Sequence, residues 1–156
     1  MTVVVACRFT EGAVLLADSR ATWIGPRTTY QDALQKILPL GGKQALVYAG
    51  DVGAAGLVVR ELRRRIRANN RLLIPRKAAL EIPRIARHYY AVYRARHRDV
   101  HPLAMVFTGV SAGGKIEIWW YQSPNFEAHQ LEKGCVTLGS GADAARKFIG
   151  RSLPTL

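Results

Sequence analysis

The residues of this chain whose types and spacing could do chemistry begin at its second position, with Thr2. A threonine hydroxyl inside a chain is a poor nucleophile. Removal of Met1 would leave Thr2 with a free α-amine beside its own Oγ, and that amine can act as the base. We expect this removal, because initiator methionine is usually cleaved before a residue as small as threonine. Further candidates follow in the order Asp18, Arg20-Ala21-Thr22, Lys36, Gly50 and Gly139-Ser140-Gly141. Their order and spacing suggest a catalyst rather than a generic domain.

Two predicted hairpins must position the first of these candidates. Residues 2–9 and 13–18 are rich in apolar and β-branched side chains and are separated by the turn residues Glu11-Gly12, which predicts two paired strands. Residues 20–34 are more polar and contain the breaker Gly25-Pro26, so we predict a long loop.

The second predicted hairpin joins residues 35–40 to residues 44–49 across Gly41-Gly42. Lys36 then lies at the beginning of the third strand. Gly50 ends the fourth strand, where the chain turns into a helix.

Two helices are predicted next. Residues 51–69 carry an apolar stripe formed by Val58 or Val59, Leu62 and Ile66, with arginines largely on the other side. Pro75 suits the first turn of a second helix that extends towards His97, and Pro83 inside it predicts a kink or a late start. The inner side of this helix is predicted to be Ala79, Ile82, Ile85, Ala86, Tyr89 and Tyr93.

Strands return after the helices. We predict strands at residues 103–110, 115–122 and 135–138, a weaker strand at 126–131, and a short helix at 142–149. Because strands and helices are segregated along the chain, the pattern favours an α+β layered sandwich over alternating βαβ units.

Length and composition indicate one domain, residues 1–156, that is long enough to bury a core. No apolar run approaches the roughly 18–20 residues that span a membrane, and residues 3–7 lack the layout of a signal peptide. Cys7 and Cys135 lie in apolar, strand-like runs, so we interpret both thiols as core side chains. Without a cysteine framework or export signal, a cytoplasmic location is expected.

The formal net charge of +12 is concentrated in one third of the chain. Residues 60–99 contain 13 Arg and Lys against three acidic residues, a net charge of +10. Such a segment could bind nucleic acid, a polyanion or an acidic partner. No nucleic-acid-binding motif accompanies it, so we favour a solvated helical face or a docking surface for an acidic partner ring.

Five segments together resemble the proteasome β-subunit and HslV-type peptidase family, the threonine branch of the N-terminal-nucleophile hydrolases. The resemblance extends from Thr2 to about Phe148, with each segment in the family's order and near its spacing. The segments are Thr2, Leu16-Ala17-Asp18-Ser19-Arg20-Ala21-Thr22, Gln35-Lys36-Ile37, Tyr48-Ala49-Gly50 and Leu138-Gly139-Ser140-Gly141.

The resemblance implies a four-layer αββα sandwich and a threonine endopeptidase that works inside a homo-oligomeric ring or double ring. Its substrates would be proteins or peptides, and an ATP-driven unfoldase would be a partner. No cofactor and no metal are implied, and neither membrane nor nucleic acid is expected as a partner.

The resemblance also implies roles for single residues. Thr2 Oγ would attack a peptide carbonyl, and Lys36, paired with Asp18, would lower the barrier to ionising that hydroxyl. The Gly50 N–H would stabilise the oxyanion, and the Ser140 hydroxyl would orient the Thr2 amine.

Substrate contacts follow from the same resemblance. Arg20, Ala21 and Thr22 correspond to the rim that pairs with an extended substrate as an added strand. The Tyr48 side chain would lie near the first specificity pocket.

The family usually continues past the Gly-Ser-Gly helix with another long helix and closing strands, which carry a further acidic residue that supports the Thr amine. The chain ends at Leu156, so the resemblance implies a sandwich that lacks its last helix and strands, with one face partly uncovered. A truncated product, a fragment and a natural short form remain open explanations.

Other interpretations of the same residues remain open. Asp18 and Arg20 could form a structural ion pair, and Ser140 could be only a helix N-cap. The chain could then be an inactive shell subunit, or a basic protein that binds polyanions or nucleic acid. His97 and His101 have the spacing of two metal ligands, but without a third ligand we favour a surface pair at a helix end.

Overall fold

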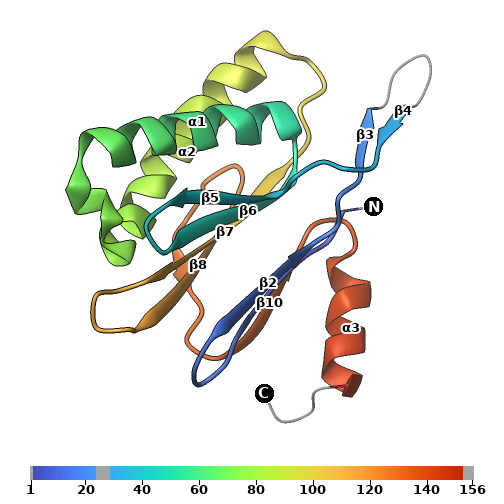
Figure 1. Ribbon diagram of the computed structural model, residues 1–156. Coiled ribbons are helices and arrows are strands. Elements are labelled where there is room, and N and C mark those ends of the chain that lie inside the picture. Colours follow the sequence, from blue (N-terminus) through green and yellow to red (C-terminus); the bar gives the residue numbers. More distant parts are fainter. Residues whose placement is uncertain (1, 24–28, 153–156) are drawn as a thin grey trace.

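The computed structural model of the protein describes residues 2–23 and 29–152. Its largest sheet is antiparallel, with strand order β5-β6-β7-β8-β9 (Figure 1). The apolar runs predicted as strands form its four longer members, and the weak candidate at 126–131 contributes only two paired residues. The bounds are β5 Ile37–Gly41, β6 Gln44–Gly50, β7 Leu103–Val110, β8 Ile116–Gln122 and β9 His129–Gln130.

A second antiparallel sheet has the order β10-β1-β2, formed by Gly134–Leu138, Val4–Arg8 and Ala13–Ala17. The first predicted hairpin is therefore confirmed, with Val4 opposite Ala17. On its other edge β1 pairs with β10, so Cys7 faces Cys135 at a Cα–Cα distance of 4.1 Å and the two form a disulfide. The interpretation as thiols was wrong, although Cys7 is buried in the core and Cys135 is partly buried, as expected of core side chains.

Helices α1 (Val52–Ala68) and α2 (Pro75–Arg96), linked by the 3₁₀ helix η1 (Asn70–Leu73), cover one face of the five-stranded sheet (Figure 1). Asp51 caps α1, because its Oδ1 accepts the Ala54 N–H at 2.9 Å. The predicted stripe of α1 is confirmed: Val58, Leu62 and Ile66 are buried against the sheet, while most of its arginines lie outside the core.

Pro83 lies inside α2, which begins at Pro75, so the late start is excluded of the two predicted effects, a kink or a late start. A proline removes the N–H that would bond the carbonyl four residues earlier, here that of Ala79. The buried Tyr121 hydroxyl of β8 donates to this carbonyl at 2.9 Å, which satisfies the group that Pro83 leaves unpaired. Tyr90 of α2 is buried, and Tyr89 and Tyr93 of the predicted inner side are partly buried and pack against the same core.

Two separate cores show how the layers stack. One lies between the α1–α2 pair and the five-stranded sheet, and the other lies between the two sheets. Helix α3 (Ala142–Ser152) contacts β10 and β1 on the outer side of the smaller sheet (Figure 1). Apolar side chains remain exposed there, at Val14 and Leu16 of β2 and at Phe148 of α3.

The predicted loop at 20–34 contains a short hairpin instead, in which β3 (Ala21–Trp23) pairs with β4 (Thr29–Gln31). Its breaker, Gly25-Pro26, lies outside the described residues. Within the described ranges, none of the helices combines the length and the apolarity that crossing a membrane requires.

Candidate active site

Thr2 is held by the Gly-Ser-Gly turn that joins β10 to α3. Its N–H donates to Ser140 Oγ at 2.9 Å, and its carbonyl accepts the Gly141 N–H at 2.9 Å. Gly139 has a φ of +95°, and a Cβ at this position would lie 2.5 Å from the Thr2 carbonyl oxygen. A glycine is therefore required for the turn to approach Thr2 this closely.

Asp18 links the backbone near Thr2 to Lys36. Its Oδ1 accepts the Val3 N–H at 2.8 Å, and its Oδ2 accepts from Lys36 Nζ at 2.7 Å and from the Arg20 N–H at 3.2 Å. Lys36 Nζ also donates to the Arg20 carbonyl at 2.6 Å. The Lys36 side chain is 3% exposed and that of Asp18 is 23% exposed, so the cation is the more deeply buried member of the pair.

The charge state of Asp18 follows from these contacts. Burial alone would raise the pKa of its carboxyl, but the hydrogen bonds from Lys36 and the Val3 N–H and the charge of Lys36 outweigh it, so the pKa lies below the ordinary 3.8. Asp18 is thus ionised at neutral pH and compensates the buried Lys36.

A pocket of about 470 Å³ brings four of the predicted catalytic residues together: Thr2, Lys36, Gly50 and Ser140 line it. Asp18 does not line this pocket but holds the Lys36 ammonium group that does. Gly50 has a φ of +105°, and a Cβ there would fall 1.8 Å from the Pro102 carbonyl oxygen, so the bend between β6 and α1 requires glycine.

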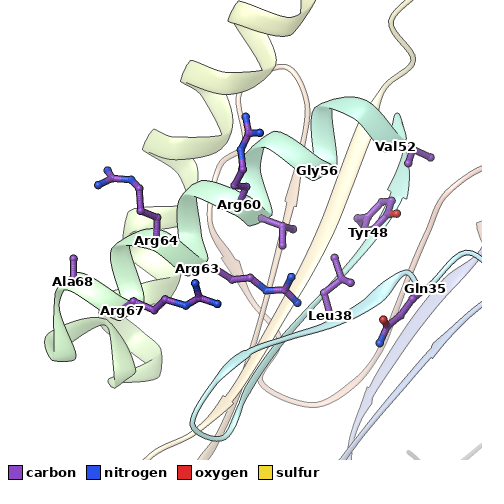
Figure 2. Close-up of a pocket in the computed structure, with 11 residues that line it drawn as sticks. Gln35, Leu38, Tyr48, Val52, Gly56, Arg60, Arg63, Arg64, Arg67 and Ala68 are labelled. Carbon is purple, nitrogen blue, oxygen red and sulfur yellow. The ribbon is translucent and has the colours of Figure 1, made fainter.

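The predicted substrate residues separate into two groups. Arg20 and Ala21 line the Thr2 pocket, whereas Thr22 pairs with Tyr30 in the β3–β4 hairpin. Tyr48 is 4% exposed and lines a neighbouring pocket of about 840 Å³ (Figure 2). Burial raises the pKa of its hydroxyl.

The alternative of an Asp18–Arg20 ion pair is not the arrangement found. Asp18 forms its ion pair with Lys36, while the Arg20 guanidinium pairs with Asp32 at 2.6 Å on the surface.

Sequence reasoning missed other residues that line the Thr2 pocket, above all His101 and Gln122. His97 stacks on Tyr93 at the end of α2, and His97 and His101 are both exposed. Sheet register brings Gln122 to the site, because it lies opposite Ala104 in the β7–β8 ladder. In the part of the chain that the structure describes, no three His, Cys, Asp or Glu side chains cluster in a way that could hold a metal ion.

Comparison with known proteins decides the family. A family model described as proteasome subunit matches residues 2–153, nearly the whole chain. The chain belongs to the proteasome subunit family. Thr2, the buried Lys36 and the Gly-Ser-Gly turn of this proteasome subunit therefore lie in a member of the family that the sequence resembles.

Among solved structures, 466 chains match this proteasome subunit. One is a chain from the helical assembly of the Anbu complex from Pseudomonas aeruginosa, with a TM-score of 0.79 and 19% sequence identity. The match covers 97% of the present chain and 66% of the Anbu chain, so the subunit spans just under two thirds of that relative. At this identity the likeness concerns the fold. A search of curated proteins found no match.

Proposed function

We propose that this proteasome-family subunit is a threonine endopeptidase that cleaves peptide bonds with the Thr2 hydroxyl after Met1 has been removed. The observation that carries the proposal is Lys36, a nearly fully buried cation held by Asp18 at the wall of the Thr2 pocket. Burying such a pair is costly and often brings no net stability, so a purely structural subunit has little use for it.

In the proposed reaction, Thr2 Oγ attacks the carbonyl carbon of the scissile bond. Its proton passes to the free Thr2 amine, which Ser140 orients through the 2.9 Å contact to the Thr2 nitrogen. The Lys36 charge favours the developing alkoxide. The Gly50 N–H stabilises the oxyanion, and one such donor typically lowers the barrier by about 3 kcal/mol.

Collapse of the tetrahedral intermediate breaks the C–N bond, and the protonated Thr2 amine gives its proton to the leaving amine. The acyl group is then bound to Thr2 as an ester. A water molecule, deprotonated by the same amine, hydrolyses the ester and restores the hydroxyl.

The substrate is proposed to bind as an extended strand along β3. In the described part of the chain β3 pairs only with β4, so its other edge offers unpaired backbone groups next to Ala21.

The setting of the enzyme is also a proposal. The Anbu relative is described as a helical assembly. We propose that this subunit also assembles into a homo-oligomer, and that its active sites are enclosed there. The fold of each subunit is proposed to be the four-layer sandwich of the family. An unfoldase partner and a cytoplasmic location belong to the same proposal. Because disulfides are rare in reducing compartments, the Cys7–Cys135 pair tests this location: in a cytoplasmic protein, alkylation during cell lysis should find both cysteines reduced.

Substitution of the nucleophile tests the function. Thr2→Ala should abolish peptide hydrolysis while leaving folding and assembly unchanged, and Thr2→Ser should retain part of the activity. If the wild type and Thr2→Ala release product at the same rate, the chain is a non-catalytic shell subunit.

A further inference from the structure

A second pocket lies directly beside the proposed active site. It follows one face of α1, has a volume of about 840 Å³ and shares Val52 with the Thr2 pocket (Figure 2). Val52 is two residues after Gly50, the proposed oxyanion donor. The second pocket therefore adjoins the Thr2 pocket at Val52.

The pocket is strongly positive. Arg60, Arg63, Arg64 and Arg67 line it, and none of the described lining residues is acidic. Among the described residues, Glu61 compensates Arg64 through an ion pair at 2.7 Å. Within the described residues, Arg60, Arg63 and Arg67 form no ion pair with a carboxylate.

Arg63 is the best fixed of these cations. Its Nε and Nη2 donate to the Pro39 carbonyl at 3.2 and 2.9 Å, which ties a half-buried guanidinium across the groove between α1 and β5. Figure 2 shows the guanidinium directed toward Leu38, the strand residue that lines the pocket together with Tyr48. A carbonyl satisfies hydrogen bonds but supplies no negative charge, so the cation still attracts an anion.

Helix geometry places two of these arginines on the face of α1 that carries Val52. Val52, Gly56, Arg60 and Arg63 share one face of α1, at spacings of four, four and three residues. Helical side chains lean towards the N-terminus of the helix, which here is the Val52 end. Gly56 has open space above its Cα, so no side chain there separates Val52 from Arg60.

We propose that this pocket binds an acidic side chain, Asp or Glu, of the residue on the acyl side of the scissile bond, and that Arg63 with Arg60 determines this specificity. The inference rests on the proposed peptidase function and adds its substrate class. Guanidinium and carboxylate form charge-assisted, often bidentate hydrogen bonds. Because the pocket is open to solvent, we expect a preference of about tenfold in kcat/KM rather than an absolute requirement.

The experiment compares three fluorogenic peptides that differ only in the residue before the scissile bond: Glu, Gln or Lys. Wild-type protein should cleave the Glu peptide about tenfold faster than the Gln peptide, and the difference should shrink at high salt. Arg63→Gln should lower the ratio of the Glu rate to the Gln rate from about ten towards one. Arg63→Glu should shift the preference to the Lys peptide.

Arg87→Gln is the matched control. Arg87 is an exposed arginine that also donates to a proline carbonyl, that of Pro83 at 3.3 Å, but it does not line the pocket. Its substitution should leave the ratio of Glu to Gln cleavage unchanged. Equal cleavage of Glu and Gln peptides by the wild type, or equal loss on both in Arg63→Gln, overturns the specificity. If none of the three peptides is cleaved in a Thr2-dependent way, the peptidase proposal itself fails, and the specificity fails with it.

Discussion

The two members of the Lys36–Asp18 pair should respond very differently to removal of their partner. Asp18→Asn and Lys36→Met break the same 2.7 Å ion pair but leave different charges behind. After Asp18→Asn, the remaining charge is a lysine that is 3% exposed, and its formally neutral acceptors are the Asn amide and the Arg20 carbonyl. After Lys36→Met, the remaining charge is a carboxylate that is 23% exposed and still accepts the Val3 and Arg20 N–H groups.

An uncompensated buried charge costs about 3–5 kcal/mol, so we expect Asp18→Asn to lower the free energy of unfolding by about 3–4 kcal/mol. Lys36→Met should cost about 1–2 kcal/mol, because the Asp18 carboxylate keeps two donors and reaches water. For a domain of this size, each kcal/mol corresponds to a change in Tm of roughly 2–4 °C. The Tm should therefore fall by roughly 6–16 °C for Asp18→Asn and roughly 2–8 °C for Lys36→Met.

Urea and thermal unfolding at pH 7, followed by circular dichroism, measure both costs. The double variant completes the cycle, and it should be more stable than Asp18→Asn alone because no charge is left buried. If Lys36→Met costs as much as Asp18→Asn, or if the two costs simply add, then Lys36 is not the desolvated member of the pair and the reasoning is wrong.

Three further outcomes follow from the geometry. Gly50→Ala should destabilise the protein severely, by more than about 3 kcal/mol, because its Cβ would meet the Pro102 carbonyl at 1.8 Å; a Tm within a few degrees of wild type would contradict this. Hydrogen bonds from Arg64 and Arg65 lower the pKa of the Glu61 carboxyl to about 2 from the ordinary 4.5. The stabilisation of the fold by ionised Glu61 is therefore complete above pH 4.5 and is lost as the pH falls to 2. Between pH 4.5 and pH 2, the urea midpoint of Glu61→Gln should thus fall less than that of wild type. If the two midpoints fall in parallel with pH, Glu61 does not contribute this pH-dependent stability. Ser140→Ala should reduce kcat more than it changes KM, with a loss of about 1 kcal/mol in stability, since it removes the acceptor of the Thr2 N–H; an unchanged kcat would argue against an orienting role.

The sequence predicted the parts of the fold that local pattern controls. Lys36 and Gly50 were assigned to the two ends of one hairpin because short apolar runs and the Gly41-Gly42 turn define that hairpin locally. The grouping of Ser140 with Thr2, 138 residues apart, came from the family resemblance, because nothing local in either segment indicates that they meet.

The misses share a physical cause, which is that tertiary contacts decided them. The Cys7–Cys135 disulfide and the position of Gln122 in the Thr2 pocket both follow from sheet register, which a single sequence does not reveal. The β3–β4 hairpin lies in a polar segment without alternation. Pro83 is tolerated inside α2 because a tyrosine 38 positions later, Tyr121, satisfies the carbonyl that it leaves unpaired.

Covalent labelling of the purified protein tests the central claim most directly. We predict that intact-mass analysis shows loss of Met1 and that a peptide epoxyketone, which requires both a hydroxyl and a neighbouring free amine, modifies Thr2. The Thr2→Ala variant should remain unlabelled. A folded protein that retains Met1, or that loses Met1 and still leaves Thr2 unmodified, would contradict the account.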